Sequence, residues 1–164
     1  MKLSKILKNT LLVLTACLIL SACATKKEAS IGKIEGQMQG DVYTGTDTVE
    51  YLADGVPDRV FFATNESILT TASRETLRAQ AAWLRKNPGI NVVLEGHADE
   101  RGTREYNLAL GERRANSVKE FLVSLGVDAG RIETRSFGKE RPAAEGSTSE
   151  AWAENRRVVT IIGE

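Results

Sequence analysis

From residue 56 onward, short runs of β-forming residues alternate with longer segments whose apolar residues recur at helical spacing, and this alternation decides the fold class. The runs expected to form strands are 59–63, 90–95, 131–137 and 158–162. The segments expected to form helices are 70–87, 104–125 and a short turn at 150–154. The order β-α-β-α-β-β predicts a two-layer α/β domain of the α+β type, in which the helices pack on one face of a small mixed sheet.

The N-terminal segment has the composition of a secretion signal. A lysine-bearing start precedes the apolar run 10–20, which is shorter than the ~20 apolar residues that a bilayer-spanning helix needs. The run ends in Leu-Ser-Ala-Cys at residues 20–23, which resembles the bacterial lipobox, where the cysteine is lipidated and becomes the mature N-terminus. We therefore expect a lipoprotein signal peptide at residues 1–22 and lipidation of Cys23. An ordinary signal peptide that happens to end at a cysteine is the alternative.

Residue 24 is Ala, and its identity bears on the membrane in which a lipidated Cys23 would reside. In enterobacterial lipoproteins an aspartate at that position favours retention in the inner membrane. Alanine therefore predicts the outer membrane, with the folded part facing the periplasm, and two or more acyl chains are sufficient for stable attachment. Residues 24–55 are polar and contain several glycines, so we expect a lipidated N-terminus and flexible linker over 23–55 and the folded domain over 56–164.

Composition argues against several classes of function. The charges balance, with 22 basic and 22 acidic residues, whereas a nucleic-acid-binding protein usually carries a basic face. Both cysteines, Cys17 and Cys23, lie near the N-terminus, which predicts neither a disulfide nor a cysteine metal site in the body of the chain. A single histidine, His97, and the lack of a serine in a nucleophile-elbow sequence argue against hydrolysis. We expect no enzyme activity, no cofactor, no metal and no nucleic-acid partner.

A group of charged and polar residues follows the second expected strand. Asp99 lies in the glycine-containing loop 96–102, and Arg114 lies in the following helix, seven residues after Asn107. Seven residues are about two helical turns, so Asn107 and Arg114 share one helix face, roughly 10 Å apart. An arginine at the edge of a buried stripe needs a partner, and Asp99 is the natural neighbour. Two interpretations stay open: a site for a zwitterion, or an internal Asp99–Arg114 ion pair that only orders the loop.

Four motifs resemble one family in order and spacing. They are GHADERGT at 96–103, GERRANSVKEFL at 111–122, SFGKERPA at 136–143 and NRRV at 155–158. From about Val60 to the C-terminus the chain is similar to the OmpA-like domain family, and within it to the branch of peptidoglycan-associated lipoproteins. The resemblance implies a non-catalytic domain that binds the peptide stem of peptidoglycan through diaminopimelate, whose free D-centre carries an ammonium and a carboxylate.

Carried over residue by residue, the resemblance implies the ligand contacts of this chain. Asp99 would bind the ammonium, and Arg114 would bind the carboxylate. The residues that would assist them or line the groove are Thr103, Asn107, Leu110 and Phe62. Many members of the branch have an aspartate directly after that phenylalanine, whereas this chain has Ala63, so any contact of the aspartate would be lost or moved to Thr64 or Asn65.

The resemblance also implies a partner and a role. It implies membership of the Tol–Pal system, with TolB binding the same domain, and a role in cell-envelope integrity and cell division. A wall-binding lipoprotein outside that system is the nearer alternative, and a cell-wall hydrolase is the more distant one. Among the remaining residues, Arg156 and Arg157 are interpreted as structural or rim charges, Trp83 and Trp152 as packing residues, and His97 as a residue that orders its loop through hydrogen bonds.

Overall fold

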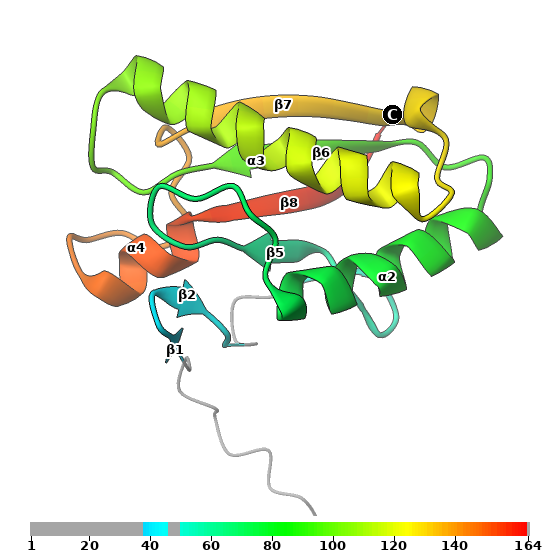
Figure 1. The fold of residues 1–164 in the computed structure, drawn as a ribbon, viewed down its shortest axis with the longest axis horizontal. Helices are drawn as coiled ribbons and strands as arrows, with labels where there is room; N and C mark the ends of the chain where they lie inside the picture. Colours follow the sequence, from blue (N-terminus) through cyan, green and yellow to red (C-terminus); the bar gives the residue numbers. More distant parts are fainter. Residues whose placement is uncertain (1–37, 46–49, 164) are drawn as a thin grey trace, which may run out of the picture. The chain divides into compact units, whose positions relative to one another are not determined.

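A four-stranded sheet with strand order β5-β8-β6-β7 is the frame of the structure, a computed structural model in which residues 38–45 and 50–163 are described (Figure 1). The strands are β5 (Arg59–Phe61), β6 (Val92–His97), β7 (Ile132–Gly138) and β8 (Arg157–Ile162). β6 and β7 run parallel, whereas β8 runs antiparallel to both β5 and β6. The sheet is therefore mixed, as the sequence predicts, and its last strand in the chain lies between the first two.

Two long helices, α2 (Thr71–Lys86) and α3 (Arg104–Ser124), cover one face of this sheet (Figure 1). Thr70 caps α2 and Thr103 caps α3, because each side chain accepts a hydrogen bond from the backbone N–H three residues later. Gly126 follows α3 with a φ of 88°, a left-handed conformation that glycine adopts readily at a helix end. The other described helical elements are α4 (Ser149–Asn155) and the 3-10 turn η1 (Ala129–Arg131). The predicted two-layer α/β fold and both long helices are confirmed.

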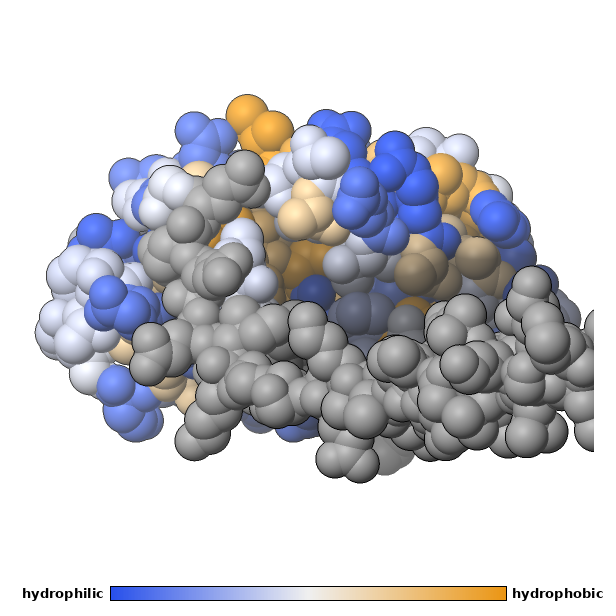
Figure 2. Space-filling model, turned by 90° about the horizontal axis from the view of Figure 1, so that it is seen from below, coloured by the Kyte–Doolittle hydropathy of each residue, from blue (hydrophilic) through white to orange (hydrophobic). Residues whose placement is uncertain are grey.

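Apolar side chains from both layers form a core between the sheet and the helices. Its members include Leu77, Ala81 and Leu84 of α2, Ala115, Val118 and Leu122 of α3, and Val60, Val92, Leu94, Ile132 and Val158 of the sheet. The three- and four-residue spacing within each helix directs one face toward the sheet, and burial of that face drives folding. On the side seen in Figure 2, most of the described surface is hydrophilic, with apolar residues confined to smaller areas. None of the described helices combines the length and the apolar content that crossing a bilayer requires.

The second strand differs from its expected bounds. β6 starts at Val92 rather than at residue 90, and it continues to His97, because Gly96 pairs with both neighbouring strands and His97 pairs with β7. The loop expected at 96–102 therefore begins only after His97.

The segment expected to be a flexible linker contains two short hairpins. β1 (Met38–Gln39) pairs with β2 (Val42–Tyr43), and β3 (Tyr51–Ala53) pairs with β4 (Val56–Pro57). Tyr43 is only 4% exposed because its ring packs edge-on against Phe61, with 4.8 Å between the ring centroids. The linker expectation is therefore wrong for residues 38–45 and 50–55, and the rest of that segment lies outside the described residues.

α3 approaches β6 closely where two glycines face each other. A side chain on Gly96 would overlap with the backbone of Gly111, and a side chain on Gly111 would overlap with the hydroxyl of Ser136. This close approach brings the first half of α3 against the end of β6. Asp99 and Arg114, the charged residues singled out from the sequence, lie in this region.

Gly96→Ala should destabilise the domain strongly, because the added methyl group meets backbone atoms of α3 that cannot move independently. We expect the free energy of unfolding to fall by about 3 kcal/mol or more, the upper range for overpacking a core. Gly89→Ala is the matched control, since nothing lies within 4 Å of a methyl group placed there. Urea unfolding of both purified variants measures the difference, and equal midpoints would contradict the close contact.

Candidate functional site

Arg114 is a charged residue in the middle of α3 with 0% solvent exposure. Its guanidinium donates three hydrogen bonds to backbone carbonyls, from Nε to Glu66 at 2.8 Å, from Nη1 to His97 at 2.8 Å and from Nη2 to Ala63 at 3.0 Å. The guanidinium also lies 5.3 Å from the centroid of the Phe62 ring. Burial lowers the pKa of Arg114 to about 10, so the side chain stays charged at neutral pH. Arg114 thereby fastens the segment after β5 to the end of β6.

Asp99 lies just after β6 and is buried. Its carboxylate accepts hydrogen bonds from the Arg101 side chain, the shortest at 2.6 Å, and a longer one from Arg156 at 3.4 Å. Burial alone would raise the pKa of Asp99, but the hydrogen bonds from Arg101 and the charges of both arginines outweigh it, so the pKa lies below its ordinary value. Among the ion pairs of the described residues, none joins Asp99 to Arg114. The internal Asp99–Arg114 pair considered from the sequence is therefore wrong.

A pocket of about 300 Å³ opens beside Asp99. It is lined by Thr64, Asn65, Asp99, Arg101, Gly102 and Tyr106. Arg101 links two parts of this wall, because its Nη2 donates to Thr64 Oγ1 at 3.3 Å as well as to Asp99. Asn107, on α3, donates from its side-chain amide to the Arg101 carbonyl at 2.9 Å. The loop that carries Asp99 is thus tied both to the segment after β5 and to α3.

The residues predicted to bind the ligand occupy different depths around this pocket. Asp99 lines it, and Thr103 is exposed at the start of α3. The other four are at most 3% exposed and do not line the pocket, namely Phe62, Asn107, Leu110 and Arg114. The sequence did not indicate Arg101 or Tyr106 as lining residues, although Arg101 follows Asp99 by only two residues in the same loop.

Arg156 is a buried partner of Asp99. Of the two roles expected from the sequence, a structural charge or a rim charge, the structural one is correct. It is 2% exposed, and its Nε donates to the Phe62 carbonyl at 3.0 Å. Trp152, on α4, has its ring centroid 4.3 Å from the Arg101 guanidinium. Trp152 of α4 and Arg156, the residue after α4, therefore both contact the loop that carries Asp99 and Arg101.

His97 is 2% exposed, and neither of its ring nitrogens makes a well-formed hydrogen bond to a described residue. Its ring stacks on Phe137, with 5.6 Å between the centroids and 21° between the planes. Burial, assisted by the charge of Arg157, lowers the pKa of His97 to about 3. The expectation that this side chain orders the loop through hydrogen bonds is therefore wrong, and His97 packs as a neutral ring.

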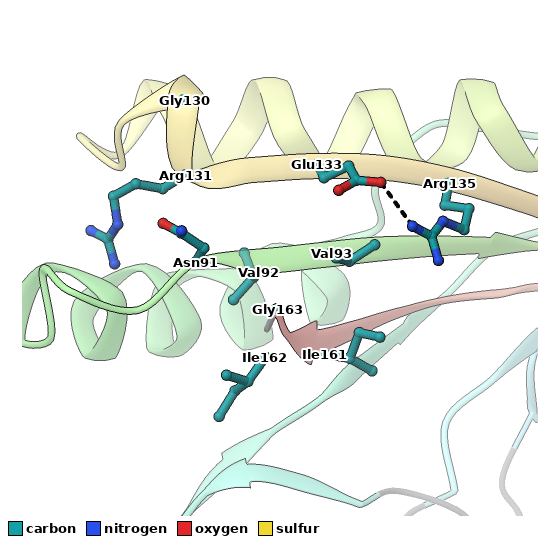
Figure 3. Close-up of a pocket in the computed structure, with 10 residues that line it drawn as sticks. All are labelled: Asn91, Val92, Val93, Gly130, Arg131, Glu133, Arg135, Ile161, Ile162 and Gly163. Carbon is teal, nitrogen blue, oxygen red and sulfur yellow. Dashed lines mark hydrogen bonds and ion pairs between the residues drawn. The ribbon is translucent and has the colours of Figure 1, made fainter.

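A larger pocket, of about 570 Å³, lies at the opposite end of β6 (Figure 3). Its two charged residues from β7, Glu133 and Arg135, pair with each other at 3.0 Å, and Val93 and Ile161 contribute apolar surface (Figure 3). None of the residues predicted to bind a ligand lines it. Ligands of α/β sheets usually bind at the carboxyl ends of the parallel strands, and this pocket lies at the other end, so the smaller pocket is the better candidate.

Comparisons of the sequence find one family. Residues 61–156 match the OmpA family. A protein named peptidoglycan-associated lipoprotein from Agrobacterium fabrum is 41% identical over 162 residues, which is 97% of this chain and 90% of that protein. The protein of the same name from Haemophilus influenzae is 38% identical over 151 residues, which is 92% of this chain and 95% of that protein. Cys23 and the expected signal peptide lie outside the described residues.

Solved structures share the fold. The peptidoglycan-associated lipoprotein from Burkholderia pseudomallei matches with a TM-score of 0.63 at 37% identity, over 65% of this chain and 90% of that chain. The C-terminal domain of MotB from Helicobacter pylori matches with a TM-score of 0.61 at 19% identity, over 65% of this chain and 84% of that chain. The second match shows a common fold alone.

Lowering the pH from 8 to 5 should destabilise the domain through His97. The unfolded state binds a proton near pH 6.5 and the folded state only near pH 3, so this contribution to stability is complete above pH 6.5 and is lost progressively as the pH falls from 6.5 toward 3. We expect the free energy of unfolding to drop by about 2 kcal/mol from this group. His97→Gln should remove the effect, since the chain has one histidine. Urea unfolding at several pH values measures it, and an unchanged pH dependence in the variant would assign it to other groups.

Proposed function

We propose, because this chain belongs to the OmpA family and to its peptidoglycan-associated lipoproteins, that its domain binds the peptide stem of peptidoglycan non-covalently. The bound group would be diaminopimelate, whose free D-centre carries an ammonium and a carboxylate on one carbon. One observation carries the proposal: Asp99 forms part of the wall of a small pocket and is kept ionised by the arginines around it.

The charges around the pocket suit a zwitterion. Asp99 would bind the ammonium, and its lowered pKa keeps the carboxylate charged at neutral pH. Three arginines near Asp99, namely Arg101, Arg114 and Arg156, create a positive field that favours a carboxylate. A ligand that carries both charges can satisfy both halves of the site at once, whereas a simple amine or a simple acid satisfies one.

Arg114 would bind the carboxylate after a rearrangement of the segment that follows β5. A guanidinium has five N–H donors, and three of them serve backbone carbonyls, so the remaining two are available to a ligand. Because Arg114 is fully buried, a ligand reaches these donors only when residues 63–66 move. Asn65, in this segment, has a φ of 57°, an uncommon conformation for a residue other than glycine that a rearrangement can relieve.

The other predicted ligand residues would shape the site. Thr103 and the backbone N–H groups at the start of α3 can assist in binding a carboxylate. Asn107 would keep the Asp99 loop in place through its hydrogen bond to the loop backbone. Phe62 and Leu110 would supply apolar surface for the carbon chain of the ligand.

The second part of the proposal is a lipid anchor. The signal peptide at 1–22 would be removed, and Cys23 would carry the acyl chains that hold the protein in the outer membrane. Residues 23–55 would then connect the membrane to the wall-binding domain, 56–164, on the periplasmic side. The protein would fasten the outer membrane to the cell wall as a mechanical tether.

We infer a role in the Tol–Pal system, with TolB as a partner, in cell-envelope integrity and cell division. The support is the relation of the chain to proteins named peptidoglycan-associated lipoprotein. Co-purification of TolB after cross-linking in cells would distinguish this role from that of a wall-binding lipoprotein outside the system. Incubation with purified sacculi would distinguish binding from hydrolysis, and we expect no release of soluble fragments.

Asp99→Asn should weaken binding to purified sacculi by tens- to thousands-fold. The ammonium of the ligand would then lie without its counter-charge in a partly desolvated pocket, a loss of about 2–5 kcal/mol. The substitution keeps the shape of the side chain and an oxygen that can accept from Arg101. Co-sedimentation of the protein with sacculi over a range of concentrations measures the affinity.

Glu133→Gln is the control for Asp99→Asn, because it removes one carboxylate from an exposed position on β7. It should leave binding unchanged, and thermal unfolding should find both variants folded. Arg114→Ala is a poorer test, since it also removes three hydrogen bonds to the backbone. Undiminished binding by the Asp99 variant would remove this residue from the site.

Cys23→Ser should abolish lipidation and release the protein from the membrane fraction, because it removes the atom to which the acyl chains would be attached. Labelling of cells with palmitate, followed by membrane fractionation, measures both effects. Cys17→Ser is the matched control, since that cysteine lies in the segment expected to be removed. A Cys23→Ser protein that still carried label in the outer membrane would refute the lipobox interpretation.

A further inference from the structure

We infer that Asp41, in the turn of the β1–β2 hairpin, occupies a carboxylate-binding position at the rim of the pocket and competes there with the carboxylate of the ligand. The inference rests on the proposed function, because a competitor requires a ligand. It adds to the site a residue that lies outside the segment matched to the family, residues 61–156.

Asp41 contacts two residues that surround Asp99. The backbone N–H of Thr64 donates to Asp41 Oδ2 at 2.7 Å, and Thr64 is part of the pocket wall. The Arg156 guanidinium donates to the backbone carbonyl of Asp41 and, at 3.4 Å, to the Asp99 carboxylate. The hairpin therefore contacts the pocket wall at Thr64, and it shares Arg156 with the Asp99 carboxylate.

These contacts form a closed ring. Asp41 binds Thr64 and Arg156, Arg156 binds Asp99, Asp99 binds Arg101, and Arg101 binds Thr64. A carboxylate fits the position of Asp41 in this ring, because a backbone N–H and arginine charges face it there. The hydrogen bond from the Thr64 N–H is the main reason why the pKa of Asp41 lies below its ordinary value, and the charge of Arg156 contributes.

The hairpin holds Asp41 near the pocket without burying its side chain. Tyr43 packs against Phe61 and Ala153, whereas Asp41 itself is exposed. The packed neighbour keeps the carboxylate close to Thr64 at a high effective concentration. Exposure keeps the hydrogen bonds between Asp41 and Thr64 weak, because water competes for both partners. A bond that is weak but always available to re-form is suited to competition with a ligand.

Ligand binding would displace the Asp41 carboxylate from Thr64. A carboxylate that takes the Thr64 N–H has to displace Asp41, because Thr64 has one such donor. The hairpin would then have lost one of its contacts, and it would be held by the packing of Tyr43 and by the hydrogen bond from Arg156 to the Asp41 carbonyl.

Asp41→Ala tests the competition directly, because it removes the side-chain acceptor of the Thr64 N–H, whereas asparagine would keep an oxygen there. The full-length protein, purified in detergent, is titrated by calorimetry with a disaccharide-tripeptide muropeptide that ends in meso-diaminopimelate. We expect the variant to bind about three- to tenfold more tightly than the unmodified protein. That range corresponds to an Asp41 carboxylate bound to Thr64 for about two thirds to nine tenths of the time, since the apparent dissociation constant equals the intrinsic one divided by the competent fraction.

Glu50→Ala is the matched control. Glu50 is an exposed carboxylate beside the second hairpin, 3.9 Å from Arg59, and does not line the pocket. Its removal should leave the affinity unchanged. A second readout is hydrogen exchange of residues 38–45 in the unmodified protein, which should become faster when the muropeptide is added.

Each outcome decides the matter. Tighter binding by the Asp41 variant, with faster exchange of the hairpin on ligand addition, supports competition. Weaker binding would mean that Asp41 contributes to the ligand site, and unchanged binding would mean that its contact is only structural, so either result overturns the inference while the proposed function stands. If neither protein binds the muropeptide, the proposed function fails and the inference fails with it.

Discussion

The buried guanidinium of Arg114 holds the binding end of this domain together. Its hydrogen bonds join the carbonyls of Ala63 and Glu66, which follow β5, to the carbonyl of His97, at the end of β6. Ala63 and Glu66 lie beyond β5 and His97 is the last residue of β6, so α3 supplies hydrogen-bond donors to carbonyls where these strands end. A buried charge is costly unless it is fully hydrogen-bonded, so the arginine and the backbone around it depend on each other. Asp99 consequently takes its charge partners from its own loop, at Arg101, and from the residue before β8, at Arg156, and it remains at the pocket wall.

The position of α3 makes this interaction possible. Gly96 and Gly111 allow the helix to lie against β6 at a distance that any side chain would prevent. The parallel pair of β6 and β7 brings its carboxyl ends to one edge, and the loop that leaves β6 there enters α3 at Thr103. Ligands of α/β sheets commonly bind at such an edge, because loops and a helix N-terminus gather there. The location of the pocket therefore follows from backbone geometry before any charged side chain is considered.

Local patterns in the sequence were sufficient to predict where the long helices begin and end. They were insufficient to predict which residues contact each other in the site. Helix-capping residues and apolar spacing placed α2 and α3 within one residue of their observed ends. The position of Arg114 at the edge of a buried stripe likewise indicated that this arginine needs partners, which are backbone carbonyls. The buried partner of Asp99 could not be found in this way, because Arg156 follows it by 57 residues and a helical wheel relates residues of one element only. The hairpin that ends at Tyr43 was missed because two-residue strands have no periodicity to detect.

The place of β8 in the sheet has a consequence for biosynthesis. It is the last described strand, yet it lies between β5 and β6, and β5 has no other neighbour in the four-stranded sheet. A chain synthesised from its N-terminus therefore keeps β5 unpaired until residues 157–162 have emerged, and such long-range pairing forms late. Arg156 immediately precedes this strand, so Asp99 gains its buried partner in the same step. A chain that stops before Arg156 has all the residues that line the pocket, but it lacks both a central strand of the sheet and the buried arginine that pairs with Asp99.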